Sequence, residues 1–126
     1  MAGYLVDTSA WIEYLEGSVI GEKVNKCISE NEIYATELII SEVISKVKRK
    51  KGNVESAFKI LSSFSSLINI DITTAKEAGI LHAAEKEKNP SFSLADALII
   101  KAAQKNNLKI LTKDSHFKSF KEASLI

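Results

Sequence analysis

The chain reads Tyr4-Leu5-Val6-Asp7-Thr8-Ser9-Ala10-Trp11-Ile12 near its start, so a short apolar run ends in a carboxylate and two hydroxyls follow. The apolar run predicts a buried strand, and the residues after it predict a helix. Asp7 is therefore expected at the carboxyl end of a strand. In open α/β sheets, ligands bind outside this edge, near the point where the strand order reverses. Other acids that reach the same edge would form a metal-binding cup with Asp7.

The remainder of the chain alternates between strand and helix patterns. Short β-type runs predict further strands over residues 33–36, 67–72, 109–112 and 123–126. Apolar residues at helical spacing predict helices over residues 9–15, 19–28, 37–50, 54–64, 74–88 and 94–103. Because strands alternate with helices, we expect a parallel sheet that helices cover on both faces.

Several residues mark where these helices start and stop. Gly17 fits a left-handed C-cap after the first helix, and Thr36 is the expected N-cap of the helix over residues 37–50. Capping-box patterns stand at Thr74-Ala75-Lys76-Glu77 and at Ser93-Leu94-Ala95-Asp96. Pro90 ends the helix before it, since the residue preceding a proline avoids helical geometry.

The totals describe one ordinary globular domain over residues 1–126. Of the residues, 45% are hydrophobic and 26% are charged, and 17 basic against 16 acidic side chains give a formal net charge of +1. Binding of nucleic acid must therefore depend on a local cluster of positive charge. The single cysteine, Cys27, excludes an internal disulfide and a cysteine-based zinc site. Without a leader-like segment or a run of about eighteen apolar residues, we expect a cytoplasmic protein that enters no membrane.

Three further acids accompany Asp7. Asp114 follows the strand predicted over residues 109–112, and neighbouring strands lie about 4.8 Å apart, so the two carboxylates can share one cation if their strands are adjacent. Glu42 lies at the border of the apolar face of its helix, where a long side chain can reach a cleft. Asp96 is the one acid in a helix that is otherwise almost wholly apolar.

Each acid also has a purely structural interpretation. Asp7 fits an N-cap of the helix after it, and Asp96 occupies the acidic position of a capping box. Asp114 fits an Asx turn, and Glu42 fits an ion pair with Lys46 one turn later. Sequence leaves both interpretations open for every one of these residues.

The four acids together favour a metal site, because clustered carboxylates repel one another unless a cation lies between them. Mg²⁺ and Mn²⁺ prefer such oxygen ligands, and a water on the metal can serve as a nucleophile. A metal between an acidic site and an anionic substrate suits hydrolysis of a phosphodiester. Lys46 and Arg49 follow Glu42 on its helix and are the predicted phosphate contacts, whereas the other lysines up to residue 51 equally fit a solvated helix end.

At these residues the chain resembles the PIN-domain nucleases, and within them the VapC-type toxins of toxin-antitoxin pairs. The matching motifs span nearly the whole chain: Leu5-Val6-Asp7-Thr8-Ser9-Ala10, Ile40-Ser41-Glu42-Val43, Leu94-Ala95-Asp96-Ala97-Leu98-Ile99 and Leu111-Thr112-Lys113-Asp114-Ser115-His116-Phe117. The resemblance carries the catalytic role to all four acids, with Asp7, Asp96 and Asp114 as metal ligands. It also implies supporting hydroxyls, which are those of Thr8 and Thr112.

The resemblance implies an α/β/α sandwich with a central, mainly parallel sheet of four to five strands. It further implies RNA cleavage with Mg²⁺ or Mn²⁺, a homodimer, and inhibition by a VapB-type antitoxin, for which Trp11 and Tyr14 are the candidate contacts. Many relatives carry an acid two residues after the fourth motif acid, where this chain has His116, so we expect one well-occupied metal in the absence of substrate. His116 fits a ligand, a proton shuttle or an exposed turn residue, and His82 fits a structural role.

Three other functions compete with the toxin. A PIN nuclease of RNA processing would share the site but lack an adjacent antitoxin gene. A non-catalytic RNA-binding PIN domain would bind metal without cleaving RNA. A phosphoacceptor protein that uses Asp7 would not need Glu42 or Asp96, so its metal affinity would survive their removal.

Overall fold

The structure is a computed structural model that describes residues 3–126. Within that range five strands form one sheet: β1 (Gly3–Val6), β2 (Glu32–Ala35), β3 (Ser66–Leu67), β4 (Lys109–Thr112) and β5 (Ala123–Leu125). Their order is β3-β2-β1-β4-β5, and every neighbouring pair is parallel. The predicted parallel sheet of four to five strands is therefore confirmed.

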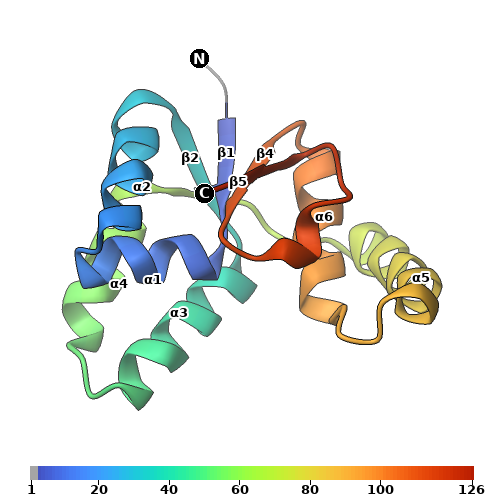
Figure 1. The fold of residues 1–126 in the computed structure, drawn as a ribbon, viewed down its shortest axis with the longest axis horizontal. Helices are drawn as coiled ribbons and strands as arrows, with labels where there is room; N and C mark the ends of the chain where they lie inside the picture. Colours follow the sequence, from blue (N-terminus) through green and yellow to red (C-terminus); the bar gives the residue numbers. More distant parts are fainter. Residues whose placement is uncertain (1–2) are drawn as a thin grey trace.

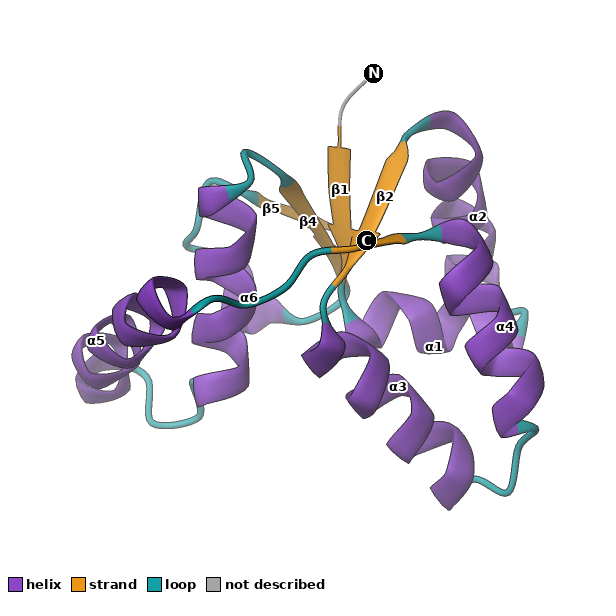
Figure 2. Cartoon of the chain, turned by 180° about the vertical axis from the view of Figure 1, so that it is seen from behind, coloured by secondary structure: helices purple, strands orange, loops and turns teal. Residues whose placement is uncertain are grey.

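The strands are joined by α1 (Thr8–Glu16), α2 (Val19–Glu30), α3 (Glu37–Arg49), α4 (Val54–Phe64), α5 (Ile72–Lys88) and α6 (Leu94–Lys105), and a 3₁₀ turn, η1, covers Ser115–Phe117. Helices α1 to α4 lie on one side of the sheet and α5 and α6 on the other, as the two opposite views show (Figures 1 and 2). This arrangement confirms the sandwich of helices, sheet and helices. Across residues 3–126, no helix has both the length and the apolar character that crossing a bilayer requires.

The strand order places its reversal point between β1 and β4. From β1 the chain builds outward through β2 to β3, and it then crosses the sheet to add β4 and β5 on the other side of β1. Val6 pairs with Leu111 in this register, so the residues that follow both strands leave the sheet side by side. Asp7 and Asp114 are therefore neighbours at the edge where α/β proteins bind ligands.

The core is centred on β1 and on the helix that precedes β4. Leu5, Val6 and Trp11 are fully buried, and so is much of α6, including Ile100 and Ala103. Helix α6 is apolar on most sides because α5 covers one face and the sheet covers another. Its one acid, Asp96, is therefore held by a rigid and well-packed element.

Local capping explains most helix boundaries. Thr36 Oγ1 accepts a hydrogen bond from the backbone N–H of Ile39 at 3.2 Å, which confirms the predicted N-cap of α3. Gly17 has a φ of 66° and ends α1, as its lack of a β-carbon allows. Helix α5 ends at Lys88, just before the Asn89-Pro90 pair.

The strand predicted over residues 67–72 is wrong beyond Leu67. Strand β3 has only two residues and lies at the sheet edge, and the N–H of Ile70 bonds to the Glu37 side chain (3.1 Å) instead of to a strand. Of the alternating isoleucines, Ile68 and Ile70 are half-buried, but Ile72 is 87% exposed. Ile68 still donates its N–H to the Ala35 carbonyl at 2.8 Å, and the residues beyond it leave the sheet.

The capping box predicted at Thr74 is also wrong. Asp71 is the N-cap of α5, because its Oδ1 accepts a hydrogen bond from the N–H of Thr74 at 2.8 Å. The helix therefore begins two residues before the predicted start, and Thr74 is buried inside its first turn. An aspartate three residues upstream competes successfully with the threonine for the same capping role.

Candidate active site

A hollow of about 130 Å³ lies at the carboxyl ends of β1 and β4. Three separate regions supply its walls: the start of α1 with the turn after β4, the middle of α3, and the first turns of α6. All four predicted acids are among its lining residues, which are Asp7, Thr8, Ser9, Glu42, Lys46, Ala95, Asp96, Ile99 and Asp114. The fold thus brings together carboxylates from four distant points of the chain.

Asp7 forms the buried floor of this hollow, with only 7% of its surface exposed. Its Oδ2 accepts a hydrogen bond from Thr112 Oγ1 at 3.0 Å and another from Ser9 Oγ at 3.3 Å. Asp7 does occupy the N-cap position of α1, but its side chain makes no capping hydrogen bond there. Its carboxylate is therefore not committed to holding the helix.

Burial raises the pKa of the Asp7 carboxyl to about 6, and the negative charge of Glu42 adds to this increase. The hydroxyl groups of Thr112 and Ser9 act in the opposite direction, because they donate hydrogen bonds to the charged form. A cation in the hollow would remove the cost of ionising Asp7.

Glu42 is directed into the hollow by a threonine. Thr8 Oγ1 donates a hydrogen bond to Glu42 Oε1 at 2.8 Å, whereas no ion pair with Lys46 is present in the described range 3–126. Lys46 lines the same hollow, so it is the nearest cation for an anionic substrate. Arg49 lies outside the lining, and its Nε donates to the Ser45 carbonyl at 3.4 Å.

Asp96 and Asp114 have both structural and site roles. Asp96 Oδ2 accepts the N–H of Ser93 at 2.9 Å while Ser93 Oγ accepts the N–H of Asp96, which confirms the capping box of α6. Asp114 Oδ1 accepts the N–H of His116 at 2.9 Å and so begins the turn η1. Each contact occupies one oxygen and fixes the carboxylate, which still lines the hollow.

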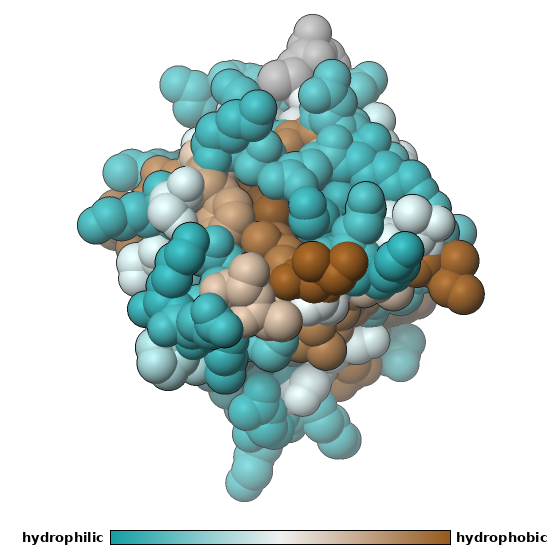
Figure 3. All heavy atoms as spheres, turned by 90° about the vertical axis from the view of Figure 1, so that its right-hand side faces the viewer, coloured by the Kyte–Doolittle hydropathy of each residue, from teal (hydrophilic) through white to brown (hydrophobic). Residues whose placement is uncertain are grey.

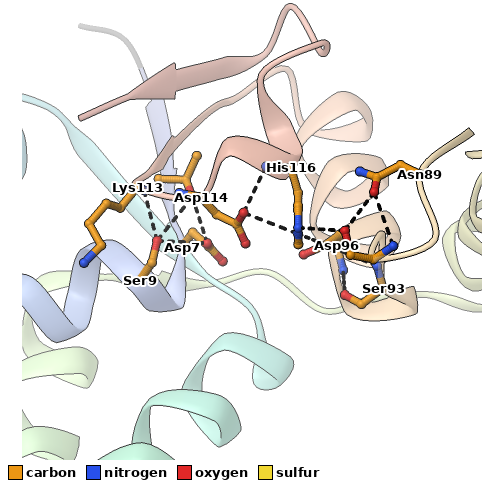
Figure 4. A network of polar contacts seen from close by, with 10 residues as sticks. Asp7, Ser9, Asn89, Ser93, Asp96, Lys113, Asp114 and His116 are labelled. Carbon is orange, nitrogen blue, oxygen red and sulfur yellow. Dashed lines mark hydrogen bonds and ion pairs between the residues drawn. The ribbon is translucent and has the colours of Figure 1, made fainter. Parts of the chain in front are cut away.

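Ser9 links the chain after β1 to the end of β4, and the sequence alone did not identify it as a site residue. Its Oγ accepts the N–H of Lys113 at 3.0 Å and lies 3.2 Å from Thr112 Oγ1 (Figure 4). Thr112 Oγ1 in turn accepts the N–H of Asp114 at 3.0 Å. The only sequence signal for this role was a second hydroxyl directly after Asp7 and Thr8.

The donor atoms fit a divalent cation. Asp96, Asp114 and His116 each place a possible ligand atom within 4.8 Å of the other two. Asp7 is not a member of this group but lines the same hollow. Three carboxylates in one small space, one of them desolvated, are a donor set that a hard or borderline divalent ion satisfies.

Fold and site together define an α/β protein with an acidic hollow at its topological switch point. The family profile of the PIN domain matches residues 4–123. The chain is also 30% identical over 119 residues to "VapC ribonuclease Mb1587" of Mycobacterium bovis and to "Ribonuclease VapC11" of Mycobacterium tuberculosis, and the match covers 90% of this chain and 87% of each relative. The chain belongs to the PIN-domain family.

Solved structures with the same fold include toxin-antitoxin complexes. One is a toxin-antitoxin complex from Klebsiella pneumoniae, with a TM-score of 0.77, 20% identity, and coverage of 96% of this chain and 95% of that one. Another is VapBC2 from Rickettsia felis bound to a DNA fragment, with a TM-score of 0.75, 19% identity, and coverage of 98% and 97%. At these identities the likeness shows the fold alone.

Proposed function

We propose that this protein is a divalent-metal-dependent endoribonuclease and the toxin of a VapBC-type toxin-antitoxin pair. The observation that carries the proposal is the common hollow of Asp7, Glu42, Asp96 and Asp114, with Lys46 at its wall. Membership of the PIN-domain family and the similarity to proteins named VapC ribonucleases support it.

Asp7, Asp96 and Asp114 would hold Mg²⁺ or Mn²⁺. The bound ion would neutralise the acids and lower the pKa of a water that attacks the phosphodiester. Thr112 and Ser9 fix the carboxylate of Asp7, and Thr8 fixes that of Glu42, so these ligands need little rearrangement. Fixed ligands reduce the entropy that binding must overcome.

Lys46 would contact a phosphate of the RNA beside the acids. Since the formal net charge is only +1, such local cations must supply the attraction to RNA. Arg49, one turn further along α3, is proposed to contact the neighbouring phosphate of the RNA.

Cleavage of pooled cellular RNA tests the function. Purified protein with Mg²⁺ or Mn²⁺ is expected to cut the pool, and both EDTA and Asp96→Asn should abolish the cuts. Asp71→Asn is the matched control, because Asp71 caps α5 and does not line the hollow. Cleavage by folded Asp96→Asn protein would contradict the proposed site.

The antitoxin would bind at a groove beside α1. A hollow of about 310 Å³ between α1, α3 and α4 is lined by apolar side chains that include Ile12, Leu15 and Ile60. Trp11 is fully buried and cannot contact a partner directly, so the neighbouring residues replace it as the candidate contacts. Co-expression with the adjacent small gene should yield a complex that Leu15→Glu prevents. Active protein without such a partner would favour an RNA-processing nuclease.

We also propose that the protein is a cytoplasmic homodimer. The side of the molecule that carries α5 has apolar surface among hydrophilic side chains (Figure 3). On this helix Ile72 and Ile80 are 87% and 63% exposed. Light scattering should give twice the monomer mass for the wild type and the monomer mass for Ile80→Glu, with Lys23→Glu, at an exposed position of α2 on the other side of the sheet, as the control.

A further inference from the structure

The ring of His116 lies between two acids of the site. Its Nδ1 is 3.3 Å from Asp114 Oδ1 and 3.4 Å from Asp96 Oδ2 (Figure 4). The side chain of Asp96 is 14% exposed, and those of His116 and Asp114 are about one-third exposed. The imidazole therefore has ordered neighbours while solvent and ions can still reach it.

The hydrogen bonds around Nε2, the other ring nitrogen of His116, indicate which ring nitrogen carries a proton. Asn89 Oδ1 accepts the backbone N–H of Ser91 (3.2 Å), so this atom is an oxygen, and the Ser91 hydroxyl must donate its proton to it at 2.8 Å. A hydroxyl has one proton, so Ser91 Oγ can only accept from His116 Nε2, which lies 3.2 Å away. The hydrogen-bond network therefore places a proton on Nε2.

In the neutral ring Nδ1 then presents a lone pair to two carboxylate oxygens. Nδ1 lies 3.3 Å from Asp114 Oδ1 and 3.4 Å from Asp96 Oδ2, and its lone pair repels both oxygens unless Nδ1 carries a proton or binds a metal ion. In proteins, a histidine that binds a metal through one nitrogen usually donates its other N–H to a fixed acceptor, as Nε2 does here.

We propose that His116 binds the metal through Nδ1 together with Asp96 and Asp114, and that it makes the site prefer borderline ions such as Co²⁺ and Zn²⁺ over the hard ions Mg²⁺ and Mn²⁺. This inference rests on the proposed function, because it specifies the metal of the same site. Imidazole suits borderline ions, whereas Mg²⁺ takes oxygen ligands almost exclusively.

The distances allow this site with a small adjustment. Ligand atoms that bind one ion at about 2.1 Å lie at most about 4.2 Å apart. The three ligand atoms already lie within 4.8 Å of one another, so the ligands must approach by less than about 1 Å. Side-chain rotation of His116 and Asp114, which are each about one-third exposed, can supply that movement.

Nitrogen NMR of the unaltered protein tests the coordination directly. The chain has only two histidines, so the ring signals of His116 and His82 can be assigned without ambiguity. Addition of Zn²⁺ should shift the Nδ1 signal of His116 strongly, leave its Nε2 protonated, and leave His82 unchanged. An unchanged Nδ1 signal at saturating Zn²⁺ would overturn the proposal.

Calorimetric titration with Zn²⁺, Mn²⁺ and Mg²⁺ tests the preference. His116→Ala should weaken Zn²⁺ binding by at least about 10- to 100-fold, the loss typical of even an outer-shell partner, and Mg²⁺ and Mn²⁺ binding by less than about threefold. His116→Asp, which replaces nitrogen with oxygen, should shift the preference towards Mg²⁺. The control is His82→Ala, since His82 stacks on Phe92 and belongs neither to the group of possible ligands nor to the lining of the hollow. Wild-type metal ratios in His116→Ala would contradict the inference.

RNA cleavage separates this inference from the proposed function. If Nδ1 binds Zn²⁺ but no metal supports cleavage of RNA, the metal site stands and the nuclease proposal fails. If RNA is cleaved but the Nδ1 signal does not respond to metal, the nuclease stands and the role of His116 fails.

Discussion

The acidic hollow has two halves with opposite physical character. The inner half consists of the buried residues Asp7 and Thr112 and the half-buried Ser9, and the two hydroxyl groups hold the carboxylate of Asp7. The outer half, Asp96 and Asp114 with His116, is partly exposed, and backbone N–H groups hold its carboxylates. The inner half is costly to ionise, whereas the outer half keeps its contact with water.

Because of this difference, we expect the two halves to contribute differently to the binding of a cation. Burial removes water from the Asp7 carboxylate and makes its charged form unfavourable. A bound cation would stabilise that charged form in place of the lost water. The outer half, which contains the one nitrogen ligand, determines which cation is preferred. Stability should therefore respond to changes in the inner half, and metal selectivity to changes in the outer half.

The largest expected effect is on the proposed cleavage of RNA, which we expect to need both halves. Asp7→Asn and Asp114→Asn should each slow RNA cleavage by about 1,000-fold, or about 4 kcal/mol of barrier, because each removes a charge at the metal. Single-turnover cleavage of a labelled RNA measures this effect. A half whose variant cleaves at the wild-type rate takes no part in the chemistry.

The next effect is on the pH dependence of stability in a chelator. The pKa of Asp7 is about 6 in the folded protein and 3.8 in the reference state. Between these values the folded state keeps a proton that the unfolded state has lost, so stability falls as pH rises from about 4 to 6. At 1.36 kcal/mol for each pKa unit, the loss is about 3 kcal/mol.

Asp7→Asn should abolish this loss and be more stable than the wild type at pH 7, with equal stability near pH 4. Urea unfolding at a series of pH values measures the difference. Asp114→Asn is the matched control in the outer half and should leave the decline in place. A wild-type decline that persists in Asp7→Asn would show that burial of Asp7 is not its source.

Sequence was sufficient for the fold because each local signal agreed with the global topology. The run before Asp7 had to be buried, and the apolar helix containing Asp96 had to be covered, so both positions followed from hydrophobicity. The failure at residues 67–72 has the opposite cause. An edge strand is specified by its neighbour, and the alternating isoleucines carried no information about that neighbour.

The site was predictable to the level of its acids but not of their partners. Asp7, Glu42, Asp96 and Asp114 could be placed at one edge from strand ends and helix faces. The hydrogen bonds from Ser9 to the chain beyond β4 depend on contacts between residues about a hundred positions apart. The sequence likewise did not show that the side chain of Lys46 lines the hollow and that the side chain of Arg49 does not.

A smaller effect is expected from the hydroxyl that joins the halves. Thr112→Val preserves volume but removes the donor to Asp7 and the acceptor for the N–H of Asp114, both at 3.0 Å. Because Thr112 is fully buried, the loss should cost about 2 kcal/mol of stability. Urea unfolding measures it, and Thr36→Val, which removes a buried N-cap whose hydroxyl bonds to the N–H of Ile39 and to no carboxylate, should cost only about 1 kcal/mol. Equal costs would mean that Thr112 acts as an ordinary buried hydroxyl.

The smallest effect is expected from Ser93, whose backbone N–H and hydroxyl both form hydrogen bonds with Asp96 of the outer half. Ser93→Ala removes the N-cap of α6 and should lower stability by about 1 kcal/mol, which thermal or urea unfolding can measure. The variant keeps the Ser93 N–H that holds Asp96 Oδ2, so metal affinity should fall by less than about threefold. The control is Ser18→Ala, which removes the N-cap of α2 together with a hydroxyl bond to Glu13 and so lowers stability without touching the acidic hollow. If Ser93→Ala weakens metal binding much more than Ser18→Ala does, the hydroxyl and not the backbone N–H positions Asp96, and the outer half then depends on side-chain hydroxyls as the inner half does.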